Sequence, residues 1–346
     1  MNRYEDDIRI TEKVKQIVKD KLPGFASRYF NDNLSTKTPR SLYGYALDLT
    51  VFFDYLSSMD YNIPQMTIDD LNKITPQIIE NYMFYIQTYM KNGSRKEASA
   101  ASQRRKYASL SSFFNYYYKL DMIDHNPFHK VESPKQPKYV TQAPTNEINY
   151  EMLDYIAYGK LDGRAAIYNA HTKDRDLAMI LLIIGAGFKV SDLVNLDIDD
   201  IHLEDNSIEL KTRKSRRTVY ISDTIADAVD KYFTKRINII AKHGDDLAFF
   251  LSLQGRRICA RAIQNIIKKY SSAIFDGKHH LTGEALALSF QNNVFKQTKN
   301  IYLASAASGK ANITLLDRYR PVIEQYSLHK GTEFEYLNAD NAPKQK

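Results

Sequence analysis

RDLAMILLIIGAGFKVSDL, residues 175–193, holds the longest apolar run of the chain, from Ala178 to Phe188. The run is shorter than the roughly 18 residues that a membrane-spanning helix needs. Its length and composition therefore predict a buried helix, which we expect from Asp174 to Ile184. Glycines close the run, and a charged segment begins at Lys189. The stretch thus predicts the central helix of a folded domain, followed by a polar turn.

The bulk properties describe a globular chain of two domains. Its 346 residues are too many for one domain of typical size. With 43% hydrophobic and 26% charged residues, the composition is that of an ordinary soluble protein. The one cysteine, Cys259, excludes an internal disulfide framework and a multi-cysteine zinc site. The amino terminus lacks the basic start and apolar stretch of a signal peptide, so we expect a cytoplasmic protein. We expect no metal or nucleotide cofactor, because the sequence has neither a glycine-rich phosphate loop nor a clustered acidic site.

The first part of the chain is predicted to be helical. Apolar residues recur at helical spacing from Ser41 to Leu56 and again from Ala101 to Leu120. Between these stretches, Thr75-Pro76 is typical of an N-cap with proline at the first helical position, and we expect that helix to end at Asn92-Gly93. Prolines and lysines without an apolar period then predict an extended linker over residues 132–146.

The second part mixes helices with short strands. Strands are expected over residues 201–210, 218–221 and 249–253, and helices after Ser222 and over residues 261–270. The predicted fold class is mainly α with a small β-sheet in the carboxy-terminal domain, which is an α+β arrangement.

Positive charge is concentrated in clusters. The formal net charge is +7, which favours a polyanionic partner. The clusters are Arg104-Arg105-Lys106, residues 211–217, Arg256-Arg257 with Arg261, and Lys268-Lys269. A solvated surface would explain any one of them, whereas several clusters flanked by apolar periodicity favour a surface that contacts phosphates.

A set of segments in the second part occurs in a recognisable order. They are residues 175–193 with their continuation 199–201, the basic stretch 211–221, residues 249–270, and the span from Gly309 to Tyr319. In this order they resemble the first box, the basic β-hairpin, the following strand and helix, and the Gly-His-to-tyrosine spacing of tyrosine recombinases of the phage-integrase type. The first part is similar to the helical core-binding domain of that family. The resemblance covers roughly residues 35–320.

The resemblance implies a domain organisation and a partner. It divides the chain into an amino-terminal extension (1–34), a helical, SAM-like core-binding domain (35–131), a linker (132–146), a tyrosine-recombinase-like catalytic domain (147–325) and a tail (326–346). The two domains are expected to clamp double-stranded DNA. Because the family assembles as a tetramer on paired sites, a homo- or hetero-tetramer with other recombinase subunits is also expected, and a membrane is not an expected partner.

The family's chemistry requires a tyrosine oxygen to attack a DNA phosphodiester while two arginines hold the non-bridging oxygens. In this chain Lys189 stands at the first arginine position and Thr282 at the second, and Lys310 replaces the histidine of the Gly-His pair. Lysine supplies a point charge without a planar fork, and threonine offers one neutral hydrogen bond. Loss of one such donor typically costs roughly 3–4 kcal/mol. The substitutions therefore disfavour strand cleavage without excluding it.

The remaining family positions are matched more closely. His279 aligns with a family histidine, Tyr319 with the nucleophile, and either Lys211 or Lys214 with the hairpin lysine, whereas Gly283 stands at the next histidine position. The resemblance thus implies this candidate catalytic set: Tyr319, Lys189, Lys211, Lys214, His279, Thr282 and Lys310. The candidate DNA contacts are Arg104, Arg105, Lys106, Lys135, Lys138, Arg213, Arg216, Arg217, Arg257 and Arg261.

Three hypotheses about function follow. In the first, the protein binds duplex DNA in site-specific recombination or integration, with weakened or lost strand cleavage. In the second, it is an active recombinase that forms a 3′-phosphotyrosine through Tyr319, with lysines in place of the usual arginines. In the third, it is a helical protein-interaction module without DNA binding, as its many aromatic residues permit.

Overall fold

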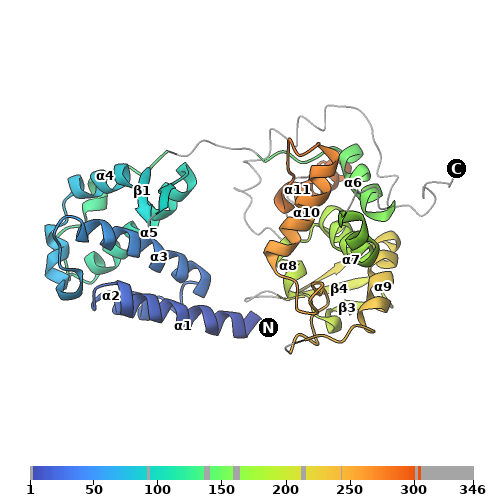
Figure 1. The fold of residues 1–346 in the computed structure, drawn as a ribbon, viewed down its shortest axis with the longest axis horizontal. Coiled ribbons are helices and arrows are strands. Elements are labelled where there is room, and N and C mark those ends of the chain that lie inside the picture. The colour runs from blue at the N-terminus through green and yellow to red at the C-terminus, as the bar shows by residue number, and fades with distance from the viewer. Residues whose placement is uncertain are drawn as a thin grey trace. The chain divides into compact units, whose positions relative to one another are not determined.

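The computed structural model describes residues 3–91, 94–135, 141–158, 164–211, 216–242, 244–300 and 303–304. The chain divides into two compact units near residue 139, inside the stretch that the sequence predicts as a linker (Figure 1). Each unit has a hydrophobic core of its own. Within the described ranges, no helix combines the length and the apolar character needed to cross a membrane.

The amino-terminal unit is helical apart from one small ribbon of two strands. The strands are β1 (Thr88–Lys91) and β2 (Ser94–Glu97). The helices are α1 (Arg3–Lys21), α2 (Ala26–Asp32), α3 (Pro39–Ser57), α4 (Pro76–Tyr85) and α5 (Ala100–Lys119), with short 3-10 helices η1 (Ile63–Gln65), η2 (Ile68–Lys73) and η3 (Pro127–Lys130).

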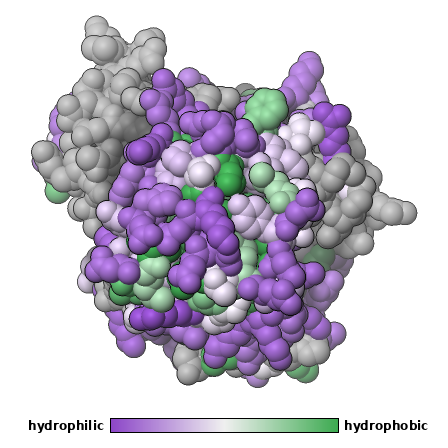
Figure 2. Space-filling view, turned by 90° about the vertical axis from the view of Figure 1, so that its left-hand side faces the viewer, coloured by the Kyte–Doolittle hydropathy of each residue, from purple (hydrophilic) through white to green (hydrophobic). Residues whose placement is uncertain are grey.

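Aromatic side chains fill the core between α3 and α5. Phe52, Phe113, Phe114 and Tyr117 are fully buried, and their rings meet edge to face, as in the 6.2 Å pair of Phe52 with Phe114. Helix α1 packs on α3 and contributes Val14 and Val18 to the same core, and Leu22, directly after the helix, joins them. The stretch predicted as an extension is therefore part of the core of this unit. Figure 2 shows a face of the unit that is mainly hydrophilic, with scattered apolar residues.

The predicted start of α4 is confirmed, but its predicted end is wrong. The Thr75 hydroxyl accepts a hydrogen bond from the backbone N–H of Ile78 at 3.4 Å, as an N-cap does. The helix ends at Tyr85 rather than at Asn92-Gly93, and the chain turns into the ribbon. Lys91 pairs with Ser94 in the antiparallel register. An Asn-Gly pair between two strands is a strong hairpin signal. The same pair can also end a helix, so the sequence alone allowed both interpretations.

The carboxy-terminal unit combines helices with an antiparallel sheet of three strands in the order β3-β4-β5. The strands are β3 (Ile201–His202), β4 (Ser207–Lys211) and β5 (Arg216–Tyr220). The helices are α6 (Asn146–Tyr158), α7 (Arg164–Ala186), α8 (Val190–Asn195), η4 (Ile198–Asp200), α9 (Asp223–Arg236), α10 (Ala260–Ile274) and α11 (Gly283–Thr298).

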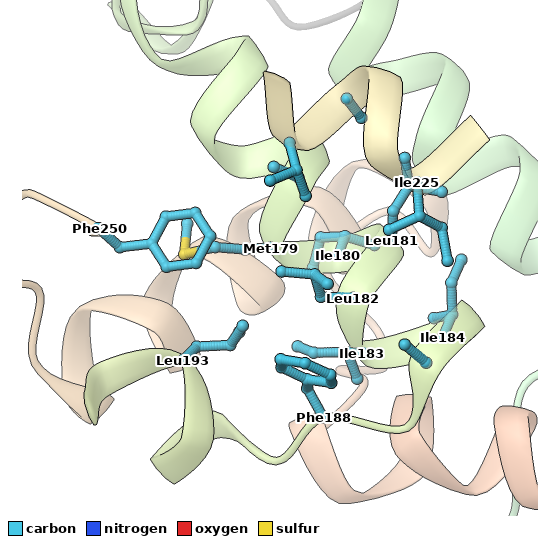
Figure 3. Close-up of a cluster of buried hydrophobic side chains, with 14 of the residues drawn as sticks. Met179, Ile180, Leu181, Leu182, Ile183, Ile184, Phe188, Leu193, Ile225 and Phe250 are labelled. Carbon is cyan, nitrogen blue, oxygen red and sulfur yellow. The ribbon is translucent and has the colours of Figure 1, made fainter. Parts of the chain in front are cut away.

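Helix α7 runs through the core of this unit, as its apolar run predicts. Every residue from Ala178 to Ile184 is buried, and Phe188 and Leu193 pack on the same cluster (Figure 3). Helices α6, α9 and α11 all pack against α7. The helix is longer than predicted because it continues toward its amino-terminal end as far as Arg164.

The predicted fold class is confirmed, with one local correction. Residues 249–253 do not form a regular strand. Phe249 and Phe250 are buried, and this part of the chain makes only isolated bridges, Asp197 with Ala248 and Leu251 with Arg257. The apolar run is therefore a buried connection beside the sheet rather than a strand of it.

Candidate functional site

A glycine turn ends α7 and leads, after the buried Phe188, to the exposed Lys189. Gly187 has φ +69°, and the backbone N–H of Phe188 donates to the Leu182 carbonyl at 3.1 Å. A Cβ at this glycine would lie 2.4 Å from the Phe290 ring of α11. Glycine is therefore required here both by backbone conformation and by close packing.

Lys189 follows the turn as the residue before α8. Its backbone N–H donates to the Asp192 carboxylate at 3.0 Å, and its side chain is exposed. The lysine is thus held by its backbone, and its ammonium is left free to meet a ligand.

The amino-terminal end of α11 lies directly against α8. The Thr282 hydroxyl accepts a hydrogen bond from the backbone N–H of Ala285 at 3.1 Å and so caps the helix. Gly283 is buried, and a Cβ on it would lie 2.5 Å from Cγ2 of Val190. A histidine at this position would therefore force the two helix ends apart. The capping bond uses one lone pair of Thr282 and leaves its hydroxyl proton for a ligand.

The amino-terminal ends of α8 and α11 and one face of α10 line an open pocket of about 840 Å³. Three basic residues line it, Lys189, Arg261 and Lys268. One acidic residue, Glu284, lies in the same lining. The excess of positive charge suits an anion. The remaining lining residues are Thr141, Gly187, Val190, Ser191, Gln264, Asn265, His280, Leu281, Thr282, Gly283, Ala287 and Gln291.

The two adjacent histidines occupy different surroundings. His280 lines the pocket, and its Nδ1 lies 3.1 Å from the Ser272 hydroxyl. His279, the residue predicted from the sequence, instead meets the Phe275 ring edge to face at 5.4 Å. The structure therefore brings His280 into the pocket lining, and sequence reasoning missed it because alignment spacing alone favoured its neighbour.

A buried ionic network holds α10 in place behind the pocket. The Asp176 carboxylate of α7, fully buried, accepts from Arg175 at 2.7 Å, from the Tyr270 hydroxyl at 2.9 Å and from Lys269 at 3.2 Å. Burial lowers the pKa of the Lys269 ammonium, while Asp176 opposes that change. Burial and the same carboxylate raise the pKa of Tyr270. The network links α7 to α10 and so fixes the helix that carries Arg261 and Lys268.

Comparison with known proteins identifies the fold. The model of the phage integrase family matches residues 164–325. The tyrosine recombinase XerC of Caldanaerobacter subterraneus is 28% identical over 290 residues, which cover 78% of this chain and 76% of that protein. The tyrosine recombinase XerS of Streptococcus uberis is 26% identical, covering 91% of this chain and 96% of the relative. Residues 164–325 belong to the phage integrase family.

Solved structures share this tyrosine recombinase fold. XerH site-specific recombinase bound to a palindromic difH substrate in a post-cleavage complex matches with a TM-score of 0.63 and 17% identity, over 84% of this chain and 78% of that one. A lambda integrase dimer bound to a COC′ core site matches with a TM-score of 0.56 and 15% identity, over 84% of this chain and 94% of that one. At these identities the likeness concerns the fold.

Two predicted DNA contacts are instead paired with carboxylates of the chain itself. Lys106 is buried, and its ammonium lies 3.1 Å from the Asp48 carboxylate. The Arg257 guanidinium donates to the carbonyls of Val194 and Leu196, each at 3.1 Å, and pairs with Asp197. These predictions are corrected, because both side chains are committed to internal partners. Arg105 also pairs with Asp48 but remains half exposed.

The hairpin lysine of the family is only partly described. Lys211 ends β4 and pairs with Asp200, which raises the pKa of the lysine, and with Glu209 at 3.8 Å. Lys214 and Arg213 lie outside the described residues. On β5, Arg216 is exposed and lies 3.4 Å from Glu209, and Arg217 is half-buried.

The remaining predicted residues divide between exposed and undescribed positions. Arg104 and Lys135 are exposed on the amino-terminal unit, and Arg261 is exposed in the pocket. Tyr319, Lys310 and Lys138 lie outside the described residues. Among the residues that are described, no group of three or more histidine, cysteine, aspartate or glutamate side chains is arranged to hold a metal ion.

Proposed function

We propose that this tyrosine recombinase relative binds double-stranded DNA at a specific site and has weakened or lost strand-cleavage activity. The observation that carries the proposal is the pocket where α8, α10 and α11 meet. Lys189, Arg261 and Lys268 give it the charge to hold a phosphate. XerH and lambda integrase, which share the fold, are described as bound to their DNA sites.

Weak cleavage is supported by what lines that pocket. Lys189 and Thr282 occupy the positions that the family resemblance assigns to arginines, and both lie in the pocket lining. Neither offers the paired, planar hydrogen bonds that a guanidinium gives to a phosphate. Gly283 cannot be replaced by a histidine without a collision with Val190. With fewer preorganised donors, the charge that develops on a five-coordinate phosphate is less stabilised.

The same proposal covers organisation and assembly. The amino-terminal unit acts as the core-binding domain and the carboxy-terminal unit as the catalytic domain, and the two clamp the duplex in the cytoplasm. Subunits assemble as a tetramer on paired sites, with copies of this chain or with an active recombinase. An inactive subunit is useful in such an assembly because it contributes site recognition, while its partners supply strand exchange.

We expect affinity for duplex DNA to fall steeply with salt, because phosphate contacts release counterions. Removing two pocket lysines, Lys189→Gln with Lys268→Gln, should flatten the logarithmic salt slope by about 2, at about 0.9 per lost phosphate contact. The matched control is Lys231→Gln with Lys235→Gln on α9, which removes the same charge outside the pocket lining. Fluorescence anisotropy between about 50 and 200 mM salt measures both slopes. A shallow slope in the unaltered protein would contradict the proposal, as would equal slopes in the two variants.

A further inference from the structure

The β1–β2 ribbon of the amino-terminal unit is a feature that the predicted DNA clamp does not use. Its strands pair in an antiparallel register from Thr88 with Glu97 to Lys91 with Ser94, and no third strand joins them in the described part of the unit. Two strands alone are only marginally stable in water. The ribbon therefore gains little from its own pairing and depends on its attachments.

The attachments of the ribbon lie at its base. Strand β1 packs on the end of α4, and β2 leads directly into α5. There the Gln103 amide donates to the Ala98 carbonyl at 2.9 Å, and the Ser99 hydroxyl caps the helix by accepting from the backbone N–H of Ser102. The base of the ribbon is thus fixed to the first turn of α5.

The described side chains of the ribbon are polar or charged. The described side chains of Thr88, Ser94, Arg95 and Glu97 are all exposed, with Arg95 71% and Glu97 74% accessible. The ten residues from Thr88 to Glu97 carry three basic side chains and one acidic side chain. This excess of basic over acidic side chains favours an anionic partner.

Positive charge continues from the ribbon along the start of α5. Arg104 is exposed and Arg105 is half exposed, and no acidic residue occurs between Glu97 and Asp121. The ribbon and the first turns of α5, which together we call the ribbon edge, thus carry more basic than acidic residues. A polyanion is the partner that such an edge complements.

We propose that the ribbon edge is a second DNA-binding element, whose β1–β2 ribbon enters the major groove of the duplex that this protein binds. The major groove accepts a two-stranded β-ribbon as well as a helix. The charge of the ribbon, on which the Arg95 side chain is exposed, supplies phosphate contacts or contacts to base edges, and Arg104 supplies a backbone contact. The inference rests on the proposed function, because it adds an element to the same DNA complex.

The test removes the charge of the ribbon and leaves the pocket intact. The ribbon variant is Lys91→Gln with Arg95→Gln and Lys96→Gln. Its matched control is Lys13→Gln with Lys15→Gln and Lys19→Gln, three exposed lysines of α1. In Figure 1, α1 and β1 lie on opposite sides of the amino-terminal unit. Both variants lose three charges, so a general effect of net charge is the same in each.

For the full-length protein on a duplex selected from a random library, we expect the ribbon variant to flatten the salt slope by about 2–3 and the control by less than about 1. Hydroxyl-radical footprinting should show loss of protection on one side of the site in the ribbon variant alone. Equal slopes and footprints in the two variants would overturn the ribbon proposal while leaving DNA binding intact. A ribbon variant that altered only self-association in sedimentation would also overturn it. Absence of salt-dependent binding in the unaltered protein would instead overturn the proposed function.

Discussion

Replacing Lys106 with methionine should destabilise the amino-terminal unit by about 3 kcal/mol, because it leaves the Asp48 carboxylate without its buried cation. Asp48 is 1% exposed, and Lys106 lies 3.1 Å from its Oδ1 atom. The usual cost of breaking a buried pair is about 3–5 kcal/mol. We expect the lower end here, because Arg105 and the Ser109 hydroxyl still donate to the other carboxylate oxygen. Urea unfolding followed by circular dichroism, with hydrogen exchange to assign the transition, measures the loss.

A double variant separates the broken pair from a simple change in packing. Asp48→Leu with Lys106→Met removes both charges, and apolar replacement of a whole buried pair is often neutral. We therefore expect the double variant to recover most of the stability lost in Lys106→Met. If the double variant is no more stable than the single one, or if the single variant stays within about 1 kcal/mol of the unaltered protein, the ion pair does not hold α5 to α3 in the way described.

Replacing Gly187 with alanine should destabilise the carboxy-terminal unit by roughly 2–5 kcal/mol. A left-handed backbone costs a residue with a Cβ about 1–2 kcal/mol, and insertion of a methyl group into a packed site costs a further 1–3 kcal/mol. Both terms apply, because φ is +69° and the new Cβ would lie 2.4 Å from the Phe290 ring. Differential scanning calorimetry of the full chain measures the shift in the transition of this unit.

Gly277 provides the matched control for the steric term. Its φ is +73°, and no atom lies within 4 Å of a Cβ built on it. Gly277→Ala should therefore show only the backbone cost of about 1–2 kcal/mol. The difference between the two variants isolates the contact with Phe290. Equal destabilisation in both would mean that the close approach of α11 to the glycine turn is relieved without cost.

Much of the fold follows from local signals in the sequence. The apolar run of α7 is long enough to be recognised as buried, and the Thr75-Pro76 pair specifies the start of α4 by itself. The predicted end of α4 is wrong because an Asn-Gly pair such as Asn92-Gly93 is typical both of helix ends and of hairpin turns. Whether the pair ends a helix or forms a hairpin turn depends on whether the flanking residues pair as strands. Local propensity does not determine that pairing.

The candidate site was predictable in part, for a related reason. Lys189 and Thr282 lie at the pocket because the glycine turn and the helix cap that place them are local features. Lys106 and Arg257 were predicted to be surface contacts because a basic residue is usually exposed. Their carboxylate partners lie 58 and 60 positions away in the sequence, so these ion pairs depend on the tertiary fold. His280 lines the pocket because the path of the loop before α11 brings it there, which spacing in the sequence does not reveal.

The most direct measurement of site-specific DNA binding with weak cleavage is covalent capture in the source cell. DNA recovered with the tagged protein is compared after native and denaturing washes, for the unaltered chain and for Tyr319→Phe. We predict discrete loci after native washes, equally enriched for both proteins, and little or no DNA after denaturing washes. A locus that survives denaturation and disappears in Tyr319→Phe would contradict weak cleavage, and the absence of any enriched locus would contradict site-specific DNA binding itself.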